Sequence, residues 1–284
     1  MRLGWYDFVF DLPDDWEITR YATAAPSGRV EFMNRHGTLG RISWEGCKKL
    51  PDEERILTEY HSRYLLQFDK DEFQGFSGIQ TERIGPFLLG YRNPGEPCQA
   101  VAHLLGCKKM LMWVFPDYSP ERLNEVWRPI LESFVANDAA WREWAAFGIQ
   151  CKLPAGFELE SAACKPADVW FAFQHKNMHR IDVHRWGLPR ELLRSWDLDA
   201  YFRHVLRGAG VRVTHSAATT WRGMASVEIS METRGTRGMD RLHGGHWLGK
   251  GRIWHNTEEK RLYAWIQAAP KKVALFEEAE MFPE

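Results

Sequence analysis

One short phrase occurs twice in this chain. "FDLPDDWEI" begins at Phe10 and "CKLPAGFEL" begins at Cys151. In both, a Leu-Pro pair is followed by two turn-forming residues, an aromatic residue, a Glu and an apolar residue. Leu12 and Leu153 lie 141 positions apart in a chain of 284 residues. Because a domain usually contains about 100 to 200 residues, this spacing predicts two domains of similar structure.

The segments after the two Leu-Pro pairs are of the same kinds and come in the same order. A strand pattern, a turn and a second strand pattern lead to a helical pattern, which contains Tyr60 in the first half and Tyr201 in the second. Both tyrosines lie 47 positions after the Pro of their half. Each half continues with a three-stranded antiparallel meander and ends with a helix. The sequence therefore predicts an α+β fold of two tandem repeats, each a mainly antiparallel sheet with a helix after the first hairpin and a C-terminal helix.

The predicted boundaries are residues 1–136 for the first repeat and 149–284 for the second. Between them, "NDAAWREWAAFG" at 137–148 has Asn137 or Asp138 as a helix N-cap and Gly148 as a stop signal. We therefore expect a short helical linker there.

Packing and turn residues of both halves give the chain a resemblance to a known fold. They are Leu12, Pro13, Trp16 and Ile130 to Phe134 in the first half, and Leu153, Pro154 and Phe157 in the second. With the order of elements, they resemble the PsbP-like fold, which includes the extrinsic photosystem II protein, the Ran-binding protein Mog, the DcrB lipoproteins and chaperones of type VI secretion effectors. The resemblance implies binding to another macromolecule, and it transfers no catalytic role to any residue.

Charge and cysteine content narrow the classes of function. Lys and Arg number 37 against 38 Asp and Glu, so no field of one sign would attract nucleic acid or an anionic membrane. No apolar run approaches the roughly 20 residues of a spanning helix, and the N-terminus lacks a signal-peptide pattern. Five cysteines without a C-x-x-C motif argue against a disulfide framework or a zinc ribbon. We expect a cytoplasmic protein that does not bind nucleic acid and does not insert into a membrane.

Tryptophan is the residue type with the most information about binding, since seven of the 14 tryptophans precede Gly148 and seven follow it. We expect five of them to face the core from strands: Trp44, Trp113, Trp170, Trp221 and Trp265. Three others stand beside basic or polar residues and are predicted to form an exposed binding surface. That predicted surface consists of Trp186, Trp247, Trp254, Arg185 and His246.

Eight of the eleven histidines follow residue 150, and they provide the alternative of an enzyme. Asp182 and His184 share a face of one predicted strand, and His246 on a later strand would complete a site of two His and one carboxylate for a metal. No close-spaced metal motif, nucleophile elbow or phosphate-binding loop supports catalysis, and no cofactor is predicted.

The sequence thus favours a non-enzymatic, cytoplasmic adaptor or chaperone-like protein that binds another protein, mainly through the second repeat. It is expected to be a monomer that acts as a pseudo-dimer of its repeats. A metal-assisted hydrolase and a structural subunit of a larger complex remain the alternatives.

Overall fold

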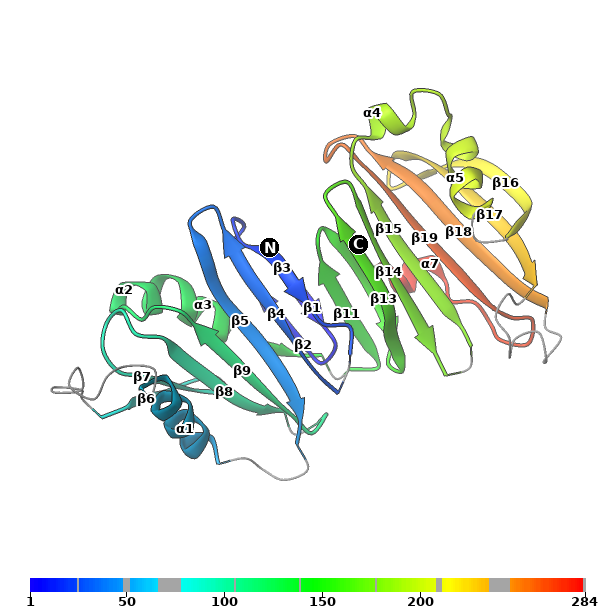
Figure 1. Ribbon diagram of the computed structural model, residues 1–284. Helices are drawn as coiled ribbons and strands as arrows, with labels where there is room; N and C mark the ends of the chain where they lie inside the picture. Colours follow the sequence, from blue (N-terminus) through cyan, green and yellow to red (C-terminus); the bar gives the residue numbers. More distant parts are fainter. Residues whose placement is uncertain are drawn as a thin grey trace. The chain divides into compact units, whose positions relative to one another are not determined.

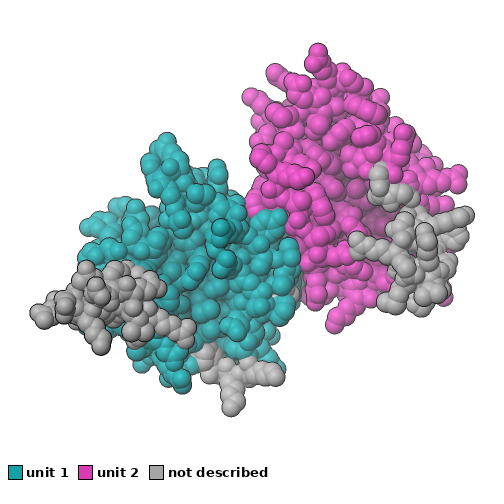
Figure 2. All heavy atoms as spheres, viewed as in Figure 1, with its two compact units in different colours: residues 1–146 teal, residues 147–284 magenta. Residues whose placement is uncertain are grey.

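The computed structural model describes residues 1–284 except 25, 48–51, 66–77, 105, 138, 177, 208–210, 235–245 and 283–284, and it does not describe the side chains of 61–65, 233, 234 and 246. Met1–Ala146 and Phe147–Glu284 form two compact units, which we call unit 1 and unit 2 (Figure 2). Among the described residues, no helix is both long and apolar enough to cross a membrane.

Unit 1 is built around a seven-stranded antiparallel sheet (Figure 1). In the order in which they lie side by side, its strands are β3 (Glu17–Tyr21), β4 (Ser27–Asn34), β5 (Gly37–Gly46), β9 (Lys109–Phe115), β8 (Cys98–Leu104), β7 (Phe87–Tyr91) and β6 (Gln80–Ile84). Helix α1 (Glu53–Leu65) connects β5 to β6, as the sequence predicts.

Both faces of this sheet are partly covered. Ile42 and Trp113 are paired across β5 and β9 and share the face that carries the main aromatic core. The helical segment made of α2 (Pro120–Arg122), the π-helical turn η2 (Leu123–Trp127) and α3 (Arg128–Glu132) contacts that face through Trp127, which stacks on Phe115 at 4.6 Å. On the other face, Leu57 of α1 packs against β7 and β8.

A smaller antiparallel arrangement in unit 1 places β10 (Val135–Ala136), β2 (Phe8–Asp11), β1 (Arg2–Trp5) and β11 (Trp141–Ala146) side by side in this order. The predicted helical linker is wrong, because residues 141–146 within it form β11. Asn137 caps no helix: its side chain donates to the carbonyl of Glu143 and accepts from the amide of Glu143, at 2.8 and 2.9 Å. Pairing of β11 with β1, where Gly4 lies opposite Ala145, outweighs the local helix preference.

Unit 2 begins with β12 (Ile149–Pro154) and contains a second seven-stranded antiparallel sheet. Its strands lie in the order β13 (Phe157–Lys165), β14 (Asp168–His175), β15 (Arg180–Trp186), β19 (Arg261–Pro270), β18 (His246–Asn256), β17 (Met224–Arg234) and β16 (Arg212–Trp221). Helices α4 (Pro189–Leu192) and α5 (Leu198–Arg207) connect β15 to β16, and α7 (Glu278–Met281) lies near the C-terminus. When the seven strands of each sheet are numbered by their order along the chain, both sheets have the same spatial order, 1-2-3-7-6-5-4.

The meander of each sheet has four strands, whereas three were predicted. The missed turns are Gly85 between β6 and β7 and Arg222-Gly223 between β16 and β17, all with positive φ. Each lies inside a stretch that reads as one long strand, so the alternation of apolar residues hides it. The C-terminal helix predicted for the second half is reduced to the four residues of α7.

Candidate functional site

Alternation along β15 assigns its side chains to two faces of the sheet of unit 2. Ile181, Val183 and Arg185 point to one face, and Val183 is paired with the buried Trp265 of β19. Asp182, His184 and Trp186 point to the other. We call the first the Trp265 face and the second the His184 face.

Helix α5 covers one part of the His184 face. Phe202 and Leu206 of α5 are buried in a cluster with Val227, Ile253 and Ala264, which lie on β17, β18 and β19. Trp186 joins the edge of this cluster, where its ring meets Tyr201 edge-on at 5.6 Å. Helix α5 contacts β16, β17 and β18 most extensively, and its described ring contact with β15 is that of Tyr201 with Trp186. Most of β14 and β15 therefore lies beside the helix (Figure 1).

Beside α5, three rings form a row on the His184 face. Trp170 of β14 and His184 of β15 are directly paired, and their rings are near-parallel at 6.4 Å. His184 is in turn stacked on Trp186 at 5.0 Å, with 14° between the rings. Trp170 and His184 are half-buried and Trp186 is buried. We call Trp170, His184 and Trp186 the aromatic row.

Charged groups flank the aromatic row at one end. Arg180 donates through Nε to both carboxylate oxygens of Asp182, at 2.9 and 3.1 Å, and lies 3.5 Å from Glu160. Burial and, to a smaller extent, the positive Arg180 lower the pKa of His184 to about 4. Burial also raises the pKa of Asp182, which Arg180 opposes. At neutral pH His184 is therefore an uncharged ring that stacks as an aromatic residue.

The corresponding positions of unit 1 carry a different chemistry. Arg29 and Ser43 are paired across β4 and β5, as Trp170 and His184 are paired across β14 and β15. Trp170 lies 141 positions after Arg29, and His184 lies 141 positions after Ser43. Arg29 is exposed and binds Glu31, at 3.1 Å. Since an uncovered sheet face is normally polar, unit 1 follows the rule at this place and unit 2 departs from it.

The residues predicted to form an exposed surface are not brought together. Trp186, Trp254 and Trp247 are only 7, 8 and 9% exposed. Trp254 and Arg185 lie on the Trp265 face, because each is paired with Tyr263. Trp247 is on the His184 face but eight positions along β18 from His255, which aligns with Trp186, so about 27 Å separates them. The side chain of His246 lies outside the described residues.

Two tryptophans outside the predicted binding surface are more accessible. Trp170 was expected in the core, but it lies on the half-open His184 face. Trp196, between α4 and α5, is 43% exposed, and its ring lies 5.0 Å from that of His204 in a tilted arrangement. Of the other tryptophans expected in the core, Trp44, Trp113 and Trp265 are buried and Trp221 is half-buried. Alternation assigns a strand residue to a face, but it does not reveal which face a helix covers.

The predicted metal site does not form. Asp182 and His184 do share a face, but Asp182 aligns through Ile266 with Gly251, and His246 is five positions further along β18. This corresponds to about 17 Å, far beyond the reach of a shared ligand shell. Within the described part of the chain, no three His, Cys, Asp or Glu side chains are placed to hold a metal ion.

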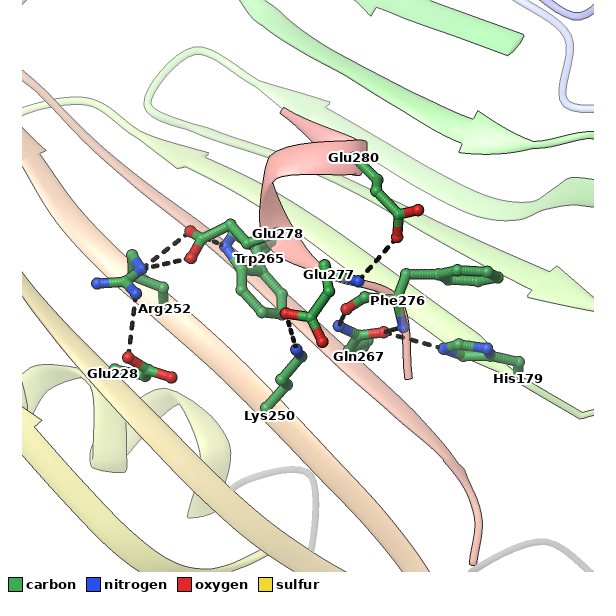
Figure 3. Close-up of polar contacts among 10 residues, drawn as sticks. All are labelled: His179, Glu228, Lys250, Arg252, Trp265, Gln267, Phe276, Glu277, Glu278 and Glu280. Atoms are coloured by element: carbon green, nitrogen blue, oxygen red, sulfur yellow. Dashed lines mark hydrogen bonds and ion pairs between the residues drawn. The ribbon is translucent and has the colours of Figure 1, made fainter. Parts of the chain in front are cut away.

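The Trp265 face carries a second polar cluster, which holds the C-terminal segment (Figure 3). Arg252 of β18 donates to both oxygens of Glu278 in α7, at 2.9 and 2.8 Å, and to Glu228 at 3.0 Å. Glu278 also accepts from the indole of Trp265 at 2.6 Å. In unit 1, the residue paired with Trp113 at the same place in the sheet is Ala100. Arg252 and Glu278 are largely buried and satisfy one another, whereas Glu228 is exposed. We therefore interpret the cluster as a structural contact that holds the C-terminal segment.

A further contact fastens the same segment. The side chain of Gln267 donates to the backbone carbonyl of Phe276 at 2.7 Å, and its Oε1 accepts from the backbone amide of Phe276 at 3.0 Å. Nε2 of His179 lies 3.2 Å from the same Oε1 of Gln267 (Figure 3). The ring of Phe276 stacks on His179 at 4.8 Å. The amide side chain of Gln267 thus bonds the backbone N–H and C=O of Phe276, as a neighbouring strand would, and holds the segment before α7.

Comparisons with known proteins give matches of fold only. No protein-family model matches the chain, and no curated protein matches it. Solved structures that are similar include the Ran-binding protein Mog1p of Saccharomyces cerevisiae, at 12% identity and TM-score 0.32, over 46% of this chain and 77% of that one. The cyanobacterial PsbP of Synechocystis sp. PCC 6803 matches at 10% identity and TM-score 0.34, over 47% and 82%.

A third similar structure spans the whole chain. It is the immunity protein TplEi of the type VI secretion system of Pseudomonas aeruginosa, in complex with a peptide, at 12% identity and TM-score 0.33, over 100% of this chain and 91% of that one. The names of these structures agree with the PsbP-like resemblance drawn from the sequence. At such low identities and TM-scores, they support no inference about a site or an activity.

Proposed function

We propose that this protein is a non-enzymatic adaptor or chaperone-like protein, which binds another protein through the aromatic row of unit 2. The observation that carries the proposal is the change from Arg29 and Ser43 in unit 1 to Trp170 and His184 at the corresponding half-open positions of unit 2. Large amphipathic rings on an accessible surface are typical anchors of protein interfaces.

The chemistry of the row suits a protein partner. The uncharged His184 and the ring of Trp170 offer a partly accessible aromatic surface, and the indole N–H of Trp170 donates no hydrogen bond within the described structure. Arg180 and Asp182 form an ion pair at the end of the row. A partner that buries the rings would place polar groups against this pair, which gives the contact orientation as well as affinity.

We further propose that the two units are tandem copies of one PsbP-like domain. Three observations support this. The strand order is the same in both sheets, and the cross-strand pair Val30–Ile42 recurs 141 positions later as Phe171–Val183. Backbone φ is positive at both Tyr6 and Phe147. Tyr6 and Phe147 are also 141 positions apart. On this proposal the second copy begins at β11, the counterpart of β1, and the first repeat still ends near residue 136.

A capture experiment with matched variants tests the binding role. The full chain is immobilised as wild type, Trp170→Ala, His184→Ala and Arg29→Ala, and the proteins retained from a lysate of its own cells are quantified. We expect one protein in stoichiometric amount on the wild type and on Arg29→Ala, and about tenfold or greater loss on Trp170→Ala and His184→Ala.

The same partner then serves to locate the surface. Hydrogen exchange of the complex should show protection of β14 and β15, and thermal melting should show that the four proteins are folded. Equal retention by Trp170→Ala and Arg29→Ala, or protection confined to unit 1, would reject the aromatic row as the binding surface.

A further inference from the structure

Strand β16 forms an open edge of the sheet of unit 2. It is the last strand in the sheet, and among the described residues only β17 pairs with it (Figure 1). The strand has ten residues, and Ala217, Ala218, Thr219 and Thr220 are all exposed. From Val213 to Trp221 it contains no Lys, Arg, Asp, Glu or Pro. Such an edge presents a row of backbone donors and acceptors without the usual protection against pairing.

The corresponding edge of unit 1 is protected. Strand β6 has five residues, and its two central charges are held by neighbouring helices. Glu82 binds Arg128 at 2.8 Å, and Arg83 binds Glu53 at 2.7 Å. Short length and charge are the devices that keep an edge strand from pairing. Strand β6 has both of these protections and β16 has neither, which indicates that the edge of unit 2 pairs with another strand.

We propose that β16 pairs antiparallel with β16 of a second copy of this chain. A two-fold axis normal to the sheet requires that one residue lies opposite itself. With Ala218 on the axis, Ala217 lies opposite Thr219 and Ser216 opposite Thr220 of the other copy. From Ser216 to Thr220 every paired position is small and uncharged, and further out His215 lies opposite Trp221. No Lys, Arg, Asp or Glu within Val213–Trp221 meets its like, and Ser–Thr pairs favour such contacts.

This self-complementarity is the reason for choosing a second copy as the occupant. A foreign strand is normally selected by pockets or charges beside the edge, whereas the exposed positions here match their own copy. The sheet of unit 2 would continue into that of the other copy with α5 on the same side of both. The proposal replaces the monomer expected from the sequence.

Sedimentation of the full chain tests the proposal. One added strand pair lies at the small end of interface sizes, below about 1,200 Å², so a transient dimer is expected and the protein is studied from roughly 1 to 300 µM. The mass should rise from 33.1 kDa toward twice that value. Ala218→Lys, which sets two Lys opposite each other, should shift the midpoint at least about tenfold to higher concentration. Ala225 is also exposed but lies on the inner strand β17, so Ala225→Lys should leave the midpoint of dimer formation unchanged. A mass of 33.1 kDa at every concentration, or equal effects of both variants, overturns the proposal.

Crosslinking tests the register independently of folding defects in the Lys variant. In a background with Cys47, Cys107 and Cys164 changed to Ser, Ala218→Cys should form a symmetric disulfide, since paired Cβ atoms lie about 4.5 to 5.5 Å apart. Thr220→Cys on the same face would lie about 14 Å from its own copy and should not crosslink. Equal crosslinking of both variants, or none for Ala218→Cys at concentrations where a dimer forms, contradicts the register.

Discussion

His184 shows how a single residue takes its chemistry from the sheet. On an exposed strand it would carry a proton near pH 6.5, but between two indoles it is kept neutral by burial, assisted by the charge of Arg180. At neutral pH the aromatic row therefore consists of three uncharged rings. A binding surface that depends on it will weaken in acid, when the ring acquires a charge.

A pH titration of stability tests this description of His184. Its pKa is about 6.5 in the unfolded chain and about 4 when folded, so the unfolded state binds the extra proton first. The free energy of unfolding should therefore fall as the pH decreases from about 6.5 to about 4, by at most roughly 3 kcal/mol from this residue. In His184→Gln that loss should be absent, as measured by urea unfolding at several pH values.

The raised pKa of Asp182 acts in the opposite sense, since its protonated form is favoured in the folded protein. Wild type and His184→Gln both keep Asp182, so their difference isolates the histidine. Parallel curves for the two proteins between pH 7 and pH 4 would show that His184 is not buried as described.

At the scale of elements, the two units close the same sheet face by different means. In unit 1 the continuous segment α2-η2-α3 begins at Ser119, whose hydroxyl accepts from the amide of Arg122 at 3.1 Å, and it covers the face with apolar side chains. In unit 2, the helix that the described residues place there is the four-residue α7, and the cluster around Arg252 holds it (Figure 3). The second closure depends on a few charged contacts, which makes it sensitive to single substitutions.

Removal of Arg252 tests this closure. Arg252→Met leaves the carboxylates of Glu278 and Glu228 without their cation, and we expect a loss of about 2 to 4 kcal/mol in the free energy of unfolding. Hydrogen exchange of residues 276–282 should accelerate more than that of unit 1. The double variant Arg252→Met/Glu278→Leu should recover part of the loss, because no buried charge is then unpaired.

Lys250→Met is the matched control on the same strand. Its ion pair with Glu277 spans 3.2 Å, but Glu277 is largely exposed, so removal should cost about 0.5 kcal/mol or less. If Arg252→Met and Lys250→Met have the same small effect, the C-terminal segment is not held by the Arg252 cluster.

At the scale of the whole molecule, the five cysteines provide reporters of opening in both units. None forms a disulfide. Cys98 of β8 and Cys151 of β12 are buried, whereas Cys47, Cys107 and Cys164 are half-buried. Burial raises the pKa of Cys98, Cys47 and Cys107, which slows reaction of the thiols with alkylating reagents.

Alkylation of the native protein followed by mass spectrometry should therefore give two classes of thiol. Cys47, Cys107 and Cys164 should react in the folded chain, and Cys98 and Cys151 only in urea, at the rate at which unit 1 or unit 2 opens. Reaction of Cys98 as fast as that of Cys47 without denaturant would mean that the core of unit 1 is more open than described.

Much of the fold follows from local patterns. The two Leu-Pro phrases, the alternation in β4, β5, β14 and β15, and the helical spacing around Tyr60 and Tyr201 predict two halves with strands and helices of the right kinds. Backbone conformation and alternation depend on neighbouring residues, so such features are readable from the chain. The segment 141–146 is the counterexample, since its strand exists because β1 is available to pair with it.

The candidate site is the part that only the tertiary structure decided. Alternation by itself predicted that Asp182 and His184 share a face, but not that this face is half-open beside α5 or that Trp170 completes the row. The same pattern made Trp254 and Trp247 look suitable, although one lies on the covered face and the other about 27 Å from Trp186. A sequence determines to which of two faces a strand residue belongs, and only the packing of distant segments determines which face is left for a partner.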